Sequence, residues 1–202
     1  MVEALEPIHL HTRPVLEMDD DQFFNFCQIN REHRIERSAE GDIIIMTPEA
    51  ASSGAGNFYL SHFFAIWGET NRSGRFFGSS AGFKLPNGAM RSPDLAWVSN
   101  ERLRTISDDD WNKFLPLCPD FVLELRSPND RLPALQEKME EYIANGARLG
   151  WLLDPARKQV HLYRPGAAPE IHDNPSEISA DPVLPGFRLE VPKIWAAMQR
   201  TR

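Results

Sequence analysis

The chain has 202 residues, and we expect it to form a single domain over residues 1–202 with its core at about residues 23–195, because a domain averages ~150 residues. Hydrophobic residues make up 42% and charged residues 25% of the chain, an ordinary composition for a globular protein. Lys and Arg number 22 against 29 Asp and Glu, which leaves a net charge of -7. This charge excludes a generally basic surface of the kind that attracts polyanions.

The sequence also lacks the features of membrane and secreted proteins. No uninterrupted apolar run is longer than Phe63–Trp67, which is far shorter than the ~20 residues that span a bilayer. Residues 1–14 carry acidic side chains and an early proline, where a signal peptide has basic and apolar regions. Cys27 and Cys118 form neither a C-x-x-C pair nor a ligand cluster. We therefore expect a cytoplasmic protein with reduced thiols and no membrane partner.

The negative charge is distributed unevenly along the chain. Residues 71–165 contain 14 basic and 12 acidic residues, whereas the two flanks together contain 8 basic and 17 acidic residues. The acidic excess therefore lies outside the middle of the chain. Because affinity for nucleic acid depends on local neutralisation of phosphates, the net charge does not exclude a nucleic-acid site in this middle region.

Caps, turns and periodicity predict the elements of the first half. Asp19–Asp21 offer an N-cap and first-turn acids for a helix. Two runs on either side of a Gly-containing turn predict a hairpin of residues 33–38 and 42–46. The small residues 50–56 lead into a second helix. Its apolar residues have helical spacing and are expected in the core; they are Phe58, Leu60, Phe63, Phe64 and Trp67.

The second half alternates short strands with helices. Ser107 precedes three aspartates, an arrangement typical of a helix cap. Residues 132–145 predict a helix closed by Gly146. Strands are expected at residues 75–79, 82–85, 94–98 and 121–126, in a hairpin of residues 150–153 and 160–163, and near Phe187, with a terminal helix around Trp195.

Two carboxylates, Asp94 and Glu124, are the first candidates for chemistry. Alternate side chains of a strand share a face, so Glu124 and Arg126 point away from the face of Phe121, Leu123 and Leu125. A carboxylate in the middle of an apolar strand is costly unless it is paired or bound to a metal. Asp94 opens its own strand and could meet Glu124 there. Two converging carboxylates suit a hard, oxygen-preferring ion such as Mg²⁺, which can activate water and polarise a phosphodiester.

Lys138 and Arg126 are the nearby candidate cations. Lys138 lies about 90° from the centre of the apolar stripe of its helix, where its stem can be buried while its ammonium reaches a cleft. An ordinary boundary lysine has the same placement. Arg126 is a poor general base because its pKa exceeds ~12. It could hold a phosphate or form an ion pair with Glu124.

Longer motifs resemble a known family. The run DFVLELRSPNDRLPALQEKMEEYIANGARLGWLLDP, together with SAGFKLPNGAMRSPDLAWV and LPGF near the end, is similar to the bacterial putative restriction endonuclease family of the PD-(D/E)XK nuclease superfamily. The resemblance covers about residues 23–195. It implies a restriction-endonuclease-like α/β fold, with a mixed central β-sheet flanked by helices, and a DNA endonuclease that uses Mg²⁺ or Mn²⁺.

The resemblance also implies roles for individual residues. Asp94 and Glu124 match the metal-binding carboxylates, and the backbone carbonyl of Leu125 matches a further ligand. Arg126 replaces the usual lysine two residues after the glutamate, and the lysine that the family carries on the next helix matches Lys138, with Tyr142 one turn later.

The resemblance is incomplete at the first core helix, which often contributes an additional acid in this family. That acid would fall near Ser52, where the chain has none. Glu49 lies three residues earlier and can substitute for it; otherwise the acid is missing.

Together these observations predict a Mg²⁺-dependent nuclease that binds DNA weakly, with Asp94 and Glu124 holding the ion, Lys138 acting on the attacking water or the developing charge, and a homodimer as one possible assembly. Two alternatives stay open. A nuclease-like fold could serve as a binding or assembly module without catalysis, as Arg126 and the displaced Glu49 favour. A carboxylate pair could also hydrolyse sugars, although the neighbouring lysine argues against that reaction.

Overall fold

The secondary structure is taken from a computed structural model that describes residues 7–200. Its mixed α/β arrangement, with helices flanking mixed sheets, confirms the fold class expected from the sequence. The helices are α1 (Asp20–Ile29), α2 (Ala51–Asn71), α3 (Asn100–Leu103), α4 (Asp108–Trp111), α5 (Leu132–Ala144) and α6 (Val191–Ala197). The strands are β1 (Ile8–Leu10), β2 (Ile35–Arg37), β3 (Ile43–Ile45), β4 (Gly74–Gly78), β5 (Phe83–Lys84), β6 (Met90–Arg91), β7 (Leu95–Ser99), β8 (Phe121–Leu125), β9 (Leu149–Asp154), β10 (Gln159–Tyr163), β11 (Glu170–Asp173), β12 (Ile178–Ser179) and β13 (Arg188–Leu189).

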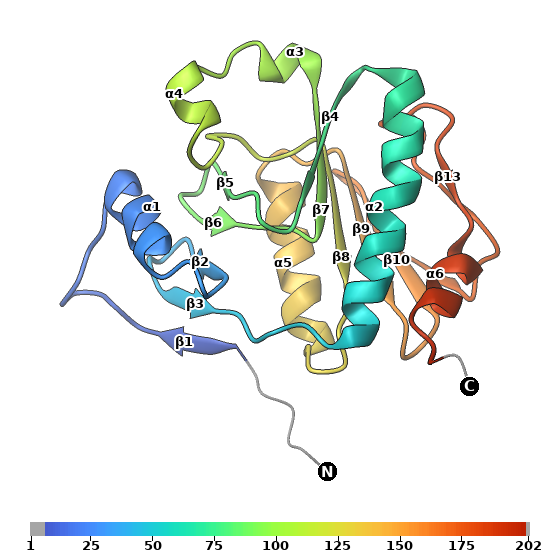
Figure 1. Cartoon of the computed structure of the whole chain (residues 1–202), viewed down its shortest axis with the longest axis horizontal. Helices are drawn as coiled ribbons and strands as arrows, with labels where there is room; N and C mark the ends of the chain where they lie inside the picture. The colour runs from blue at the N-terminus through green and yellow to red at the C-terminus, as the bar shows by residue number, and fades with distance from the viewer. Residues whose placement is uncertain (1–6, 201–202) are drawn as a thin grey trace.

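A six-stranded central sheet organises the molecule, in the order β11-β10-β9-β8-β7-β4. Strands β8 and β9 are parallel, because α5 carries the chain back between them, and the other neighbours are antiparallel. Helices α2 and α6 pack on one face of this sheet and α5 covers the other (Figure 1). Strand β8 therefore lies between two layers of helices.

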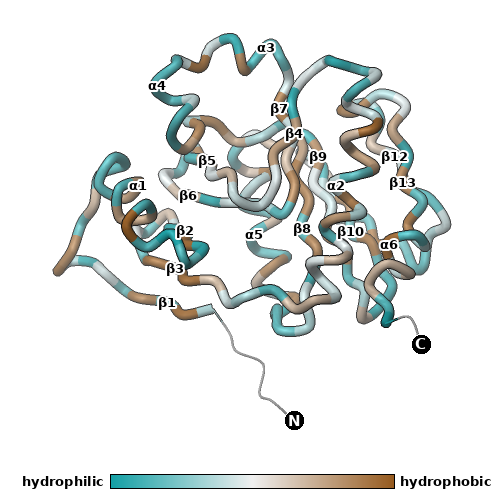
Figure 2. The backbone as a smooth tube through the Cα atoms, in the orientation of Figure 1, coloured by the Kyte–Doolittle hydropathy of each residue, from teal (hydrophilic) through white to brown (hydrophobic). Residues whose placement is uncertain are grey.

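Burial on both faces of β8 fixes the direction of its side chains. Phe121, Leu123 and Leu125 pack with α2, while Val122 lies on the opposite side among residues of α5. Each such large apolar side chain contributes roughly 1.5–3 kcal/mol when it is fully buried. Figure 2, which colours the backbone by hydropathy, shows the hydrophobic parts of β8 and β9 between α5 and α2. Glu124 shares the α5 face with Val122, as strand alternation predicts.

A second sheet carries the N-terminal part of the chain beside the central one (Figure 1). Its strand order is β1-β3-β2-β6-β5, and Phe23 of α1 packs with Ile35, Ile43 and Met90 beneath it. The hairpin of β2 and β3 and the start of α1, where Asp19 forms a capping box with Gln22, confirm the sequence predictions. Among residues 7–200, no helix combines the length and hydrophobicity needed to cross a bilayer.

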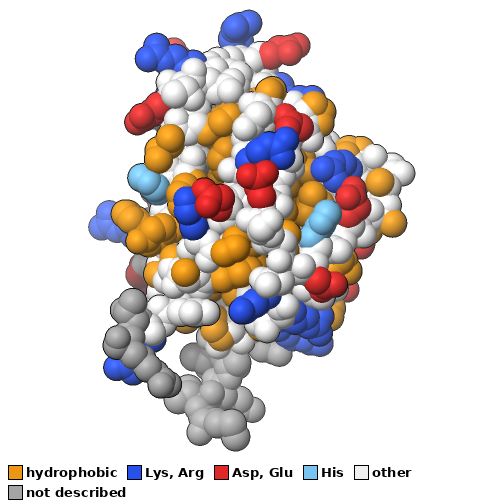
Figure 3. All heavy atoms as spheres, turned by 90° about the vertical axis from the view of Figure 1, so that its right-hand side faces the viewer, with side chains coloured by type: hydrophobic (Ala, Val, Ile, Leu, Met, Phe, Trp, Pro, Cys, Tyr) orange, Lys and Arg blue, Asp and Glu red, His pale blue; other side chains and the backbone are white. Residues whose placement is uncertain are grey.

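Helix α2 differs from its prediction in two ways. It begins at Ala51, so most of the small-residue stretch belongs to the helix instead of leading into it. Phe58 is 73% exposed and not in the core, because the buried stripe of the helix runs through Ser53, Gly56, Leu60 and Phe64. Figure 3, which views the side of α2 and α6, shows hydrophobic side chains scattered among charged ones on that face.

Other short elements were not anticipated. Strands β1, β6 and β11 extend the two larger sheets, and β12 pairs with β13 in a sheet of its own. They are two to four residues long, too short to show a periodicity of their own. Pairing with neighbouring strands defines them.

We predict opposite tolerances for two glycines of β4. A Cβ on Gly74 would lie 2.2 Å from the backbone oxygen of Val98, whereas one on Gly78 would meet no atom within 4 Å. Gly74→Ala should therefore lower the free energy of unfolding by roughly 1–3 kcal/mol, and Gly78→Ala should leave it nearly unchanged. Urea unfolding of both variants tests this, and equal stability would contradict it.

Candidate active site

The antiparallel register of β7 and β8 brings Asp94 and Glu124 together. Leu95 pairs with Leu123 and Ala96 with Val122, so continuing the register by one residue puts Asp94 opposite Glu124. Asp94 Oδ2 accepts a hydrogen bond from the backbone N–H of Leu125 at 2.9 Å, which directs its carboxylate to the end of β8. The two carboxylates therefore meet at one point of the sheet, as the sequence predicts.

Burial changes the chemistry of Glu124, whose side chain is 5% exposed. Burial disfavours its charged form most strongly, and the neighbouring Asp94 acts in the same direction, while Lys138 opposes both. The result is a pKa of Glu124 raised to about 7. Asp94 and Glu124 are thus two buried, neighbouring carboxylates that a bound cation would stabilise.

Helix α5 supplies the groups that contact Glu124. Lys138 Nζ lies 2.9 Å from Glu124 Oε1, and Tyr142 donates its hydroxyl to the same oxygen at 3.2 Å. The two residues are one turn apart and therefore on the same side of the helix. The apolar residues Leu132, Met139 and Tyr142 hold this side against the sheet. The predicted boundary position of Lys138 thus becomes a buried contact.

Strand β2 brings a third acid, Glu36, that we did not anticipate from the sequence. Its carboxylate accepts from Lys138 Nζ at 2.9 Å, from Arg91 Nη1 at 3.2 Å and from the backbone N–H of Ser92 at 3.0 Å. Burial alone would raise its pKa, but Lys138, Arg91 and Arg34 outweigh burial and lower it to about 2. Glu36 therefore stays charged although it is only 2% exposed.

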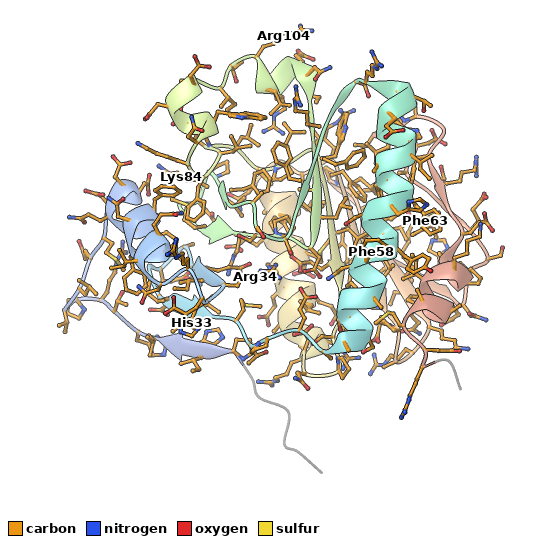
Figure 4. The ribbon with its side chains drawn as sticks, viewed as in Figure 1. His33, Arg34, Phe58, Phe63, Lys84 and Arg104 are labelled. Atoms are coloured by element: carbon orange, nitrogen blue, oxygen red, sulfur yellow. The ribbon has the colours of Figure 1, made fainter. Side chains whose placement is uncertain are left out.

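Arg34, just before β2, is the second unanticipated residue. Its Nη1 lies 3.2 Å from Asp94 Oδ1 and 3.6 Å from Glu49 Oε1, and its other terminal nitrogen donates to the carbonyl of Ser92. Figure 4 shows Arg34 between the N-terminal sheet and α5. Glu49, which precedes α2, therefore reaches the site through Arg34, and it also accepts a hydrogen bond from Asn57.

Arg126 does not form the ion pair with Glu124 that we considered from the sequence. Its Nη1 binds Asp154 Oδ2 at 2.9 Å and its Nε donates to the carbonyl of Asp130. Strand β8 ends at Leu125, so the alternation that would align Arg126 with Glu124 stops one residue too early. Asp154 is the fully buried end of β9.

A cavity of about 310 Å³ opens over the two carboxylates and is lined by Glu49, Asp94, Glu124 and Leu125, among others. All their donor atoms are oxygens, which suits Mg²⁺ or Mn²⁺. Among the described residues, no group of three or more His, Cys, Asp or Glu side chains is arranged to hold a metal. Two carboxylates and a carbonyl still fit Mg²⁺, because this ion usually keeps several waters.

Comparisons with known proteins bear on the family and the fold of this chain. The sequence model of the Uma2 family, described as putative restriction endonuclease, matches residues 20–192. A crystal structure of a putative nuclease belonging to DUF820 from Anabaena variabilis superposes with a TM-score of 0.74. It is 17% identical, and the match covers 91% of this chain and 100% of that one, so it supports the fold. No curated protein matches the chain.

The raised pKa of Glu124 predicts a pH-dependent stability. In the unfolded chain this carboxyl ionises near pH 4.5, whereas in the native protein it ionises near pH 7. Between these values the native state binds the proton more tightly, so this group reduces stability as pH rises. Glu124→Gln removes the titration. As the pH rises from 5 to 8, the free energy of unfolding of Glu124→Gln should therefore increase by on the order of 1–3 kcal/mol relative to that of the unmodified protein.

The measurement is urea unfolding of both proteins at the two pH values in the presence of EDTA. EDTA is included so that metal binding does not contribute to the difference. A stability difference between the two proteins that does not change with pH would contradict the shifted pKa.

Proposed function

This chain belongs to the Uma2 family of putative restriction endonucleases, and from that premise we propose that it is a divalent-metal-dependent DNA endonuclease that hydrolyses phosphodiester bonds. The observation that carries this proposal is the convergence of Asp94, Glu124 and Lys138. Their elements are joined by the register of β7 with β8 and by the 2.9 Å contact from α5. These residue types and this proximity are what phosphodiester hydrolysis assisted by a metal requires.

In the proposed reaction, Asp94, Glu124 and the carbonyl of Leu125 would hold Mg²⁺ or Mn²⁺. The ion would supply activation of a bound water and neutralisation of phosphate charge. Tyr142 fixes the orientation of Glu124 through its hydroxyl. The ammonium of Lys138 has three N–H donors. Two are used by Glu36 and Glu124, which leaves one to orient the attacking water or to stabilise charge on the phosphate.

We assign Glu49 and Arg126 no direct step in this reaction. Glu49 acts on the site through Arg34, at 3.6 Å. Arg126 is tied to Asp154, so its positive charge is already matched and its phosphate contact would require that ion pair to open. Both therefore remain accessory residues of the proposal.

A second candidate function is a DNA-binding or assembly module that does not cut. The contact of Arg34 with Asp94 favours it, because a guanidinium on that carboxylate competes with a metal for the same oxygens. The two functions differ in one measurable property. The endonuclease needs a cation at Asp94 and Glu124, and the binding module does not.

The proposed reaction predicts how variants cleave supercoiled plasmid in the presence of Mg²⁺ or Mn²⁺. Asp94→Asn and Glu124→Gln each remove a metal-binding charge and should lower the nicking rate by at least ~100-fold, and Lys138→Met should lower it comparably. Gel electrophoresis of nicked and linear products measures the rates.

Glu140→Gln is the matched control, because this exposed glutamate lies on the same helix as Lys138. It should cut at the rate of the unmodified protein. Unchanged cleavage by the Asp94 and Glu124 variants would refute the assignment. DNA binding with no cation-dependent cleavage by any form of the protein would instead favour the binding module.

The proposal also predicts how the affinity for DNA depends on divalent ions and on salt. The net charge of -7 and the acidic site oppose the approach of phosphates, so binding should be weak without a divalent ion and should strengthen when Mg²⁺ or Ca²⁺ is added. Few phosphates are neutralised by such a surface, so the decrease in affinity with salt should be shallow. Fluorescence anisotropy of a labelled duplex tests both. An affinity that falls steeply with salt and does not change when Mg²⁺ or Ca²⁺ is added would contradict this interpretation.

A further inference from the structure

Lys138 is shared by two buried carboxylates that belong to different sheets. Its Nζ lies 2.9 Å from Glu36 Oε1 on β2 and 2.9 Å from Glu124 Oε1 on β8. All three side chains are at least nine-tenths buried. The two acids therefore share the ammonium at equal distances. Only Glu124 belongs to the proposed metal site.

This sharing matters because an ammonium and a metal ion compete for the same carboxylate. If Lys138 paired with Glu124 alone, both a full positive charge and a charge-assisted hydrogen bond would be concentrated on that carboxylate. A divalent ion would then have to displace it. A second acid on the same ammonium, Glu36, offsets part of its positive charge and lowers that competition.

We propose that Glu36 is a positioning residue that binds Lys138 and offsets part of its positive charge, and so keeps Glu124 available to a divalent cation. This inference rests on the proposed function, since it concerns the same site. It gives a role to a buried charge on a strand outside the central sheet.

The surroundings of Glu36 set this role apart from one that is only structural. Its other charged partner, Arg91, has a second acid, Glu141, at 2.6 Å, so Arg91 does not depend on Glu36 for a carboxylate. The backbone N–H of Ser92 needs only an oxygen acceptor, which a glutamine at position 36 also provides. What glutamine cannot provide is the negative charge that holds the ammonium of Lys138.

The test is calorimetric titration with Mn²⁺, without DNA, of the unmodified protein and its variants. Glu36→Gln should weaken Mn²⁺ binding by about tenfold or more, the effect expected for one charge-assisted hydrogen bond. Adding Lys138→Met to Glu36→Gln should restore the affinity to within about threefold of Lys138→Met alone, because the competing ammonium is then absent. A structural defect at Glu36 would not be rescued in this way.

Glu141→Gln is the matched control. It removes one negative charge from the same region and breaks the other ion pair of Arg91, yet it leaves the Glu36–Lys138 contact in place. Its Mn²⁺ affinity should stay within about threefold of that of the unmodified protein. An effect as large as that of Glu36→Gln would show that net charge alone is responsible and would overturn the inference.

The outcomes separate this inference from the proposed function. If Asp94→Asn abolishes Mn²⁺ binding but Glu36→Gln does not weaken it, the metal site stands and the role of Glu36 is refuted. The role is also refuted if the double variant binds as weakly as Glu36→Gln. If the unmodified protein binds no Mn²⁺, both are refuted. Thermal unfolding monitors each variant, and Glu36→Asp, which is too short to reach Lys138 fully, replaces Glu36→Gln if that variant does not fold.

Discussion

One buried ammonium, that of Lys138, joins the parts of this molecule that form the candidate site. It contacts Glu124 of the central sheet and Glu36 of the N-terminal sheet, each at 2.9 Å. Removing an ion from water costs several kcal/mol unless pairing offsets it, so none of these three charges is tolerable alone at such burial. The two sheets and α5 must therefore come together for any of them to be buried. Folding of the core and assembly of the site are one event.

The same constraint explains why the two acids differ so much. Glu36 accepts from two cations and a backbone N–H, and its pKa falls to about 2. Glu124 shares one cation and faces Asp94, and its pKa rises to about 7. Neighbouring carboxyls whose pKa values are driven apart commonly have different roles in a site. In the proposed function, Glu36 offsets part of the charge of the lysine, and Glu124 is left to respond to a cation.

Much of the framework could be predicted locally. The caps at Asp19 and Ser107, the helix closed by Gly146 and the apolar alternation around Glu124 each depend on residues close in sequence, and each is present in the structure. The pair of Asp94 and Glu124 could also be anticipated, because Asp94 opens its strand, Glu124 lies within an apolar strand, and both match the carboxylates of the family that the sequence resembles. Phe58 could not be placed, since its direction depends on how α2 is rotated against the sheet.

The sequence by itself determined the longer elements, the class of fold and several residue types of the candidate site, since periodicity and capping act over a few residues. Only the tertiary structure decided which charges meet. Glu36 and Lys138 are 102 residues apart, and Arg34 and Asp94 are 60 apart. Arg126 contacts Asp154 instead of Glu124, because β8 ends one residue before Arg126. Such contacts follow from the packing of one sheet against another, and no local pattern encodes that packing.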